Sequence, residues 1–124
     1  MRLMPFVVDA IIDRTPAPVA PQTMLMPSIS DEMFTAEKGS GAFMNNRRLR
    51  VAARRELHEA LVAYEIPNRG SKDLPLSRAE IGVLQGRVNG IRGMGSVALG
   101  LGYLAAGRVD ALVCRNIQSW DIAA

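Results

Sequence analysis

The sequence predicts an α/β protein, in which strands and helices combine in one domain, on three observations. Residues 33–51 divide into short strand-like runs separated by glycine and asparagine turns, which is typical of a β-hairpin. Apolar residues recur at helical spacing between residues 81 and 91. A strand-like run, 109–113, follows a further helix-like segment, and the length of 124 residues suits a single core.

The composition excludes several classes of protein. Hydrophobic residues make up 48% of the chain and charged residues 22%, which is near the average for globular proteins and unlike disordered chains. Arg2, Asp9 and Asp13 interrupt the apolar stretch near the N-terminus, so it does not predict a membrane span. The apolar block 4–8 is too short for a secretory signal. We therefore expect a cytoplasmic protein.

The first half of the chain changes character at residue 31. Residues 1–30 contain a cluster of prolines, which remove backbone donors, so this segment is predicted to be loop. Strands are then expected at 33–37, 42–44 and 48–51, with turns at 38–41 and at Asn45-Asn46. Residues 57–66 fit helix or strand by period alone, and the bounding Pro67 favours strand.

The second half predicts helices. Ser77 followed by Glu80 forms a capping-box pattern for a helix that would run to Ile91, although three interspersed glycines weaken it. Residues 96–106 predict another helix, with Ser96 as its N-cap and Gly107 as its left-handed C-terminal residue.

Strand 109–113 follows, and a last helix would open at Trp120-Asp121, capped by Ser119. A helix of so few residues is marginal, so the domain is expected to be incomplete.

Several isolated residues have unremarkable interpretations. Cys114 lies in an apolar run, which favours a small buried hydrophobe over a reactive thiol. His58 has a polar context and is expected to be solvated rather than a general base. A basic cluster could attract nucleic acid, but no aromatic residues are interleaved for base stacking, so a solvated face is favoured. The cluster comprises Arg47, Arg48, Arg50, Arg54 and Arg55.

The segment Trp120-Asp121-Ile122-Ala123-Ala124 closely resembles the second signature of the inositol monophosphatase family. Residues 31–51 are similar to the family's central hairpin, and residues 95–99 and 103–110 are similar to the helix and strand before that signature. The resemblance covers 31–124 and implies an incomplete layered α+β sandwich. It divides the chain into a divergent segment, 1–30, and the central and partial C-terminal part of such a domain, 31–124.

The resemblance also implies a magnesium site. Alone, Asp121 reads more simply as an acidic residue that stabilises a helix start, but in the family that aspartate binds a catalytic metal ion. Residues 7–15 resemble a degraded first signature, Asp-Pro-Ile-Asp-Gly-Thr, with one residue inserted and Arg14 in place of glycine. By this resemblance Asp9, Asp13 and the Ile11 carbonyl would bind metal, and Thr15 would orient the attacking water. The family's upstream glutamate has no counterpart, because residues 1–8 contain no acidic residue.

The same resemblance implies a substrate site. Gly95, Ser96 and Val97 correspond to the family's segment that meets substrate hydroxyls at a helix N-terminus, although an ordinary helix cap explains them equally well. Cys114 stands where many relatives have a glutamate that hydrogen-bonds an inositol hydroxyl, and a thiol accepts hydrogen bonds weakly.

The implied function is metal-assisted hydrolysis of inositol phosphate or a related small phosphomonoester, in a protein that could be a homodimer. The alternative is a catalytically inactive family fragment that acts at most as a binding or dimerisation module.

Overall fold

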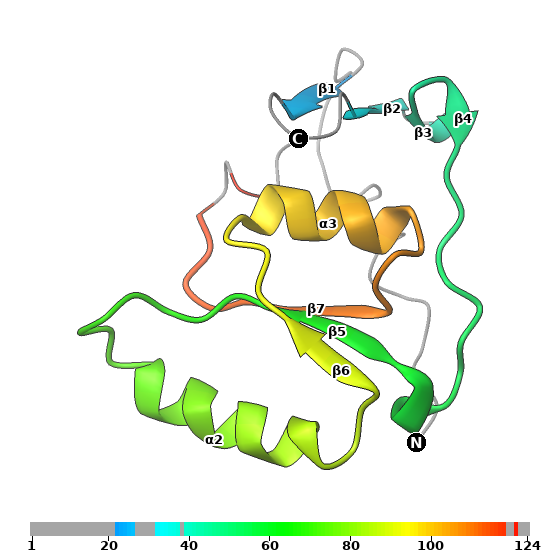
Figure 1. The fold of residues 1–124 in the computed structure, drawn as a ribbon. Coiled ribbons are helices and arrows are strands. Elements are labelled where there is room, and N and C mark those ends of the chain that lie inside the picture. Colours follow the sequence, from blue (N-terminus) through cyan, green and yellow to red (C-terminus); the bar gives the residue numbers. More distant parts are fainter. Residues whose placement is uncertain (1–21, 27–31, 38, 119–120, 122–124) are drawn as a thin grey trace.

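The structure is a computed structural model that describes residues 22–26, 32–37, 39–118 and 121. These residues form two sheets and two helices, and Figure 1 shows them stacked in layers. Helix α3 (Val97–Ala105) lies between the sheet β1–β4 and the sheet β5–β7, and helix α2 (Leu74–Gln85) lies on the far face of the second sheet. This layering confirms the predicted α/β class.

The first sheet is antiparallel and follows chain order, β1-β2-β3-β4. Its strands are β1 (Gln22–Met26), β2 (Glu32–Glu37), β3 (Gly41–Met44) and β4 (Arg47–Arg48). Asn45 and Asn46 have φ values of 46° and 65°, the left-handed conformation that asparagine tolerates in a tight turn. The predicted hairpin and its asparagine turn are therefore confirmed.

Two predictions at the ends of this sheet are wrong. Residues 22–26 form a strand rather than loop, because Pro21 and Pro27 flank the segment and leave its own backbone donors available for pairing with β2. The strand predicted at 48–51 ends after Arg48. The Leu49 N–H still donates to the Ala42 carbonyl at 2.8 Å, and the chain then leaves the sheet.

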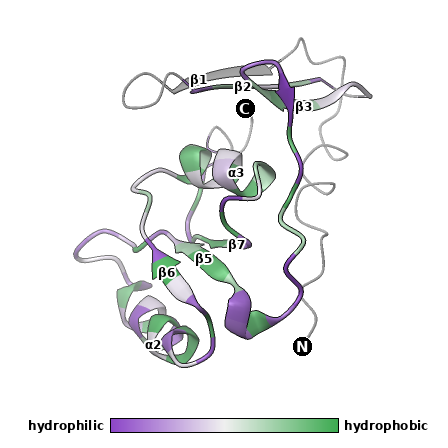
Figure 2. Ribbon diagram, turned by 45° about the vertical axis from the view of Figure 1, so that its right-hand side comes forward, coloured by the Kyte–Doolittle hydropathy of each residue, from purple (hydrophilic) through white to green (hydrophobic). Residues whose placement is uncertain are grey.

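The second sheet is parallel, in the order β6-β5-β7, and its centre is buried. Its strands are β5 (Leu61–Tyr64), β6 (Gly90–Arg92) and β7 (Ala111–Val113), with a short 3-10 helix, η1 (Leu57–Glu59), before β5. Val62, Ala63 and Tyr64 are at most 3% exposed, and Figure 2 shows β5 largely in the hydrophobic colour. A strand that is covered on both faces is a continuous apolar run, which explains why the period of this segment alone fitted either a helix or a strand.

The two helices connect the parallel strands on opposite faces of the sheet. The chain runs from β5 through α2 to β6, and from β6 through α3 to β7 on the other side of β5 (Figure 1). Parallel strands need crossovers of this kind, and helices on both faces bury the sheet.

Helix α2 corrects the capping-box prediction. The helix begins at Leu74, three residues before Ser77, and carries Pro75 in its first turn, where a missing N–H costs nothing. The Ser77 N–H donates to the Asp73 carbonyl at 2.9 Å, and Ser77 is fully buried in the helix rather than at its cap. The helix ends at Gln85, before Gly86, and Ile91 lies in β6 instead.

Helix α3 fits between the sheets because two of its residues are glycines. A Cβ at Gly100 would lie 2.9 Å from a methyl carbon of Leu112 in β7, and one at Gly102 would lie 3.2 Å from the ring of Phe34 in β2. Residues two apart in a helix point to nearly opposite faces. Each glycine therefore lets one sheet approach the helix closely.

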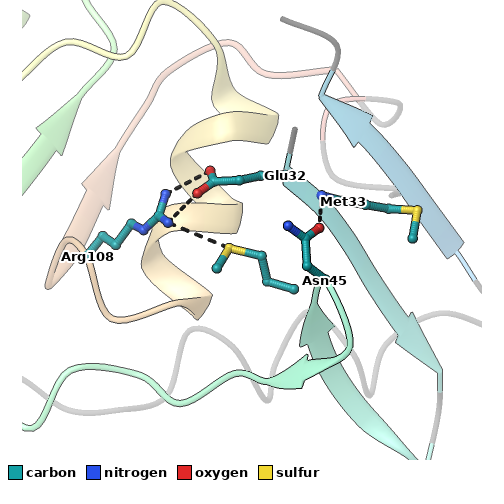
Figure 3. A network of polar contacts seen from close by, with 5 residues as sticks. Glu32, Met33, Asn45 and Arg108 are labelled. Carbon is teal, nitrogen blue, oxygen red and sulfur yellow. Dashed lines mark hydrogen bonds and ion pairs between the residues drawn. The ribbon is translucent and has the colours of Figure 1, made fainter. Parts of the chain in front are cut away.

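The segment after α3 ties the layers together. Ser96 caps the helix and Gly107 adopts φ +69°, as predicted. Arg108 then donates to both carboxylate oxygens of Glu32 in β2 (Figure 3). Its guanidinium lies 4.6 Å from the ring centroid of Tyr103. In the same view the Asn45 side-chain oxygen accepts the Met33 N–H at 2.8 Å.

Within the described part of the chain, no helix is long and apolar enough to cross a membrane.

Candidate functional site at the carboxyl edge of the parallel sheet

The segments that follow β5, β6 and β7 meet at one end of the parallel sheet. We call this end the carboxyl edge and define it by Glu65, Met94, Gly95, Ser96, Cys114 and Asp121. The carboxyl ends of parallel strands lie together, and ligands of open α/β sheets bind there. The topology therefore brings together residues that lie far apart in the sequence.

The N-terminus of α3 supplies backbone donors to this edge. Ser96 is the N-cap, and its hydroxyl oxygen accepts the Leu99 N–H at 3.3 Å. Gly95 has φ +72°, and a Cβ built on it would meet no atom of the described residues within 4 Å, so among these residues the turn borders open space. The first N–H groups of a helix lack intrahelical partners and favour anions and polar oxygens. Gly95, Ser96 and Val97 thus lie where the prediction placed them, at a helix N-terminus.

Glu65 fastens this turn to the sheet. Its N–H donates to the Val113 carbonyl at 2.9 Å, which continues the β5–β7 pairing by one residue. Its side-chain oxygen Oε1 accepts the Met94 N–H at 3.0 Å. One residue therefore connects β5, the end of β7 and the turn before α3. The sequence analysis missed it, although a charged residue directly after a buried strand was a usable signal.

Cys114 follows β7 and is a free, half-buried thiol, not the buried hydrophobe that its apolar context predicted. Burial raises the pKa of this thiol, and the negative charges of Glu65 and Asp121 raise it further. The thiol is therefore kept protonated, and both carboxylates lie within electrostatic reach of it.

Asp121 is half-buried in a turn that its own side chain stabilises. Its Oδ2 accepts the Gln118 N–H at 2.8 Å, and its own N–H donates to the Gln118 carbonyl at 3.0 Å. The carboxylate is thus held in place through Oδ2, and among the described residues Oδ1 keeps its acceptor capacity. The rest of the predicted last helix lies outside the described residues.

A metal site is not completed by the described residues. Among them, no three histidine, cysteine or acidic side chains are grouped to hold an ion, and Asp121 is the only predicted ligand described. Asp9, Ile11, Asp13 and Thr15 lie outside the described residues. The described part therefore contains one candidate ligand, Asp121, of the magnesium centre that the resemblance implies.

The basic cluster and the histidine lie elsewhere. Arg54 forms an ion pair with Asp110 at 2.8 Å, and Asp110 also accepts the Leu61 N–H at the start of β5, so Arg54 stabilises the sheet. Arg47, Arg48, Arg50 and Arg55 are exposed, as is His58.

The described residues thus define an α/β protein that presents a helix N-terminus and carboxylates at the carboxyl edge of a parallel sheet. The family model of the inositol monophosphatase family matches residues 18–124, and the chain belongs to that family.

Similar proteins agree with this assignment. The chain is 45% identical over 95 residues to an inositol-1-monophosphatase of Rhizobium meliloti, covering 77% of this chain and 36% of that protein. It is 38% identical over 96 residues to human inositol monophosphatase 2, covering 76% of this chain and 33% of that protein. The crystal structure of extragenic suppressor protein suhB from Bartonella henselae superposes with a TM-score of 0.71 at 46% identity, covering 76% of this chain and 36% of that one. The chain therefore spans about a third of the length of these relatives.

Proposed function

We propose that this chain carries the substrate-binding edge of a magnesium-dependent phosphomonoesterase that hydrolyses inositol phosphate or a related small phosphomonoester. The observation that carries the proposal is that the N-terminus of α3 and the Asp121 carboxylate belong to one edge of the parallel sheet. The names of the similar proteins from Rhizobium meliloti and human support the substrate class.

The proposal assigns roles in substrate binding, in metal binding and in orienting the attacking water. Gly95, Ser96 and Val97 would bind substrate hydroxyls, and Asp121 would hold magnesium together with Asp9, Asp13 and the Ile11 carbonyl. Thr15 would orient the attacking water. Magnesium, when bound, would activate this water and neutralise charge on the phosphate. A cytoplasmic location and a homodimer are part of the same proposal.

Phosphate release provides the test. We expect the purified 124-residue chain to release phosphate from myo-inositol 1-phosphate with magnesium and not without it. Asp121→Asn should abolish this release, because it removes the negative charge that binds the ion while keeping the oxygen that accepts the Gln118 N–H. Glu59→Gln is the control for loss of one carboxylate, since Glu59 is exposed in η1, which precedes the amino end of β5, at the opposite end of the sheet from the carboxyl edge.

A chain that releases no more phosphate with magnesium than Asp121→Asn does would contradict the proposal. The alternative, an inactive family member that acts at most as a binding or dimerisation module, would then be the better account.

A further inference from the structure

The carboxyl edge contains a carboxylate that no predicted role explains, that of Glu65. By the family resemblance, residue 114, which follows β7, corresponds to a position where many relatives have a hydroxyl-binding glutamate, and this chain has a free thiol there. Glu65 follows the neighbouring strand β5. Its N–H donates to the carbonyl of Val113, the residue directly before Cys114, at 2.9 Å. Glu65 and Cys114 are therefore neighbours across the β5–β7 pair.

The Glu65 carboxylate is oriented by one of its two oxygens. Oε1 accepts the Met94 N–H at 3.0 Å, which turns the carboxylate toward the turn that precedes Ser96. Among the described residues, Oε2 has no hydrogen-bond partner. A carboxylate has about four lone-pair sites, so acceptor capacity remains on Glu65 next to the turn that contains Met94.

This arrangement suits a hydroxyl of a substrate. A hydroxyl needs an acceptor for its proton, and a hydrogen bond to a charged acceptor is stronger than one to a neutral acceptor. An acceptor that is already held by a backbone N–H loses little side-chain freedom when it binds, which favours affinity. A phosphate group, in contrast, would be repelled by the same negative charge.

We propose that Glu65 is a specificity-determining residue of this site, which accepts a hydrogen bond from a hydroxyl of a polyol phosphate in place of the acidic side chain that position 114 lacks. The inference rests on the proposed function, because it concerns the same substrate site. The negative charge of Glu65 contributes to the raised pKa of the Cys114 thiol, which supports the inference because it indicates that the two side chains lie close together.

Two ligands separate hydroxyl recognition from phosphate binding. The purified chain is titrated, with magnesium present, with myo-inositol 1-phosphate or with methyl phosphate, and the changes in amide chemical shifts give the affinity for each ligand. Methyl phosphate has no hydroxyl on its organic part. We expect Glu65→Gln to bind inositol 1-phosphate about tenfold more weakly, as loss of one charge-assisted hydrogen bond implies, and methyl phosphate unchanged. The glutamine oxygen can still accept the Met94 N–H, so the turn is kept.

Two further variants act as controls. Glu59→Gln, at an exposed position in η1, should bind both ligands as the wild type does. Cys114→Glu combined with Glu65→Gln should restore binding of inositol 1-phosphate, because it returns a carboxylate to the neighbouring strand end. Thermal unfolding of each variant identifies any that fails to fold. If Glu65→Gln fails to fold, Glu65→Asp, which keeps the charge on a shorter side chain, replaces it in the same titrations.

The outcomes distinguish this inference from the proposed function. Equal affinity of wild type and Glu65→Gln for inositol 1-phosphate would overturn the inference alone. An equal loss for both ligands would also overturn it, because Glu65 would then only position the turn. If neither ligand binds the wild type, the proposed function fails and the inference fails with it.

Discussion

At the scale of single residues, Gly107 shows how one position can satisfy two independent demands. Its φ of +69° lies in the left-handed region, and a Cβ there would lie 2.8 Å from the Arg50 carbonyl oxygen and 2.9 Å from the Ala52 nitrogen. The first demand is local and was predicted from the sequence, because glycine commonly ends helices. The second comes from a segment that lies more than fifty residues away and could not be predicted.

Substitution of this glycine should therefore cost more than a helix cap alone. We expect Gly107→Ala to lower the free energy of unfolding by about 2 kcal/mol or more, since it adds backbone strain and a clash with backbone atoms that cannot rotate away. Gly82→Ala in α2 is the matched control, because no atom of the described residues lies within 4 Å of its Cβ position. It should raise the free energy of unfolding by about 0.5–1 kcal/mol through helix propensity. Urea unfolding measures both, and a similar change for the two variants would contradict the packing argument.

Other residues show the limits of local patterns. Ser77 and Glu80 have capping-box spacing, but Pro75 starts the helix earlier and Ser77 is buried inside it. Cys114 looked like a core residue and is half-buried at the carboxyl edge. No local pattern predicted a role for Glu65, although its carboxylate accepts the Met94 N–H and so holds the turn before α3.

At the scale of elements, helix α2 is attached to the sheet by a polar network. The Tyr64 hydroxyl at the end of β5 donates to Glu80 at 2.5 Å, and Arg115 after β7 donates to the other oxygen of the same carboxylate. The bond from Tyr64, and then the bond and charge of Arg115, hold the pKa of Glu80 below its ordinary value. Glu80 was predicted as part of a cap, and it serves to attach the helix instead.

The lowered pKa predicts how stability depends on pH. The folded state binds the Glu80 proton less tightly than the unfolded state, so the contribution is complete above the ordinary pKa of about 4.5. It is lost as the pH falls through the lower pKa of the folded state. We expect the difference in free energy of unfolding between wild type and Glu80→Gln to be largest at neutral pH and to shrink in this acidic range.

Urea unfolding at a series of pH values checks this expectation. Glu59→Gln controls for the loss of one carboxylate at an exposed position. A difference that is constant from neutral to acidic pH would show that the charge of Glu80 does not stabilise the fold.

At the scale of the whole molecule, α3 joins the two sheets. Phe34 in β2 is 6% exposed and lies against Gly102, while Gly100 faces Leu112 in β7. Arg108 adds an ion pair to Glu32, which lies two residues before Phe34 in β2 and therefore on the same face of the strand. Cooperative folding of the two sheets should therefore depend on this helix.

Removal of the Phe34 ring tests that dependence. We expect Phe34→Ala to lower the free energy of unfolding by about 3–5 kcal/mol, because it leaves a cavity between α3 and the first sheet. Amide protons of β3 should then exchange faster, while those of β5 keep more of their protection. Met33→Ala changes the neighbouring side chain, which is 36% exposed, and should cost far less. Equal costs for the two variants would mean that α3 does not hold the first sheet.

The predicted division of the chain at residue 31 and the role of residues 7–15 remain predictions. The strand at 22–26, which pairs with β2, shows that the first sheet includes residues before that division.

The sequence by itself determined the hairpin at 33–44, the asparagine turn, helix α3 with its cap, and the family. These features depend on backbone preferences of glycine, asparagine and serine, which act within a few residues. Only the tertiary structure decided that residues 90–92 form a strand, that α2 starts at Leu74, and that Glu65 faces the turn before α3. Parallel pairing joins segments that lie far apart in the chain, so the contacts between them produce no pattern within a short stretch of the sequence.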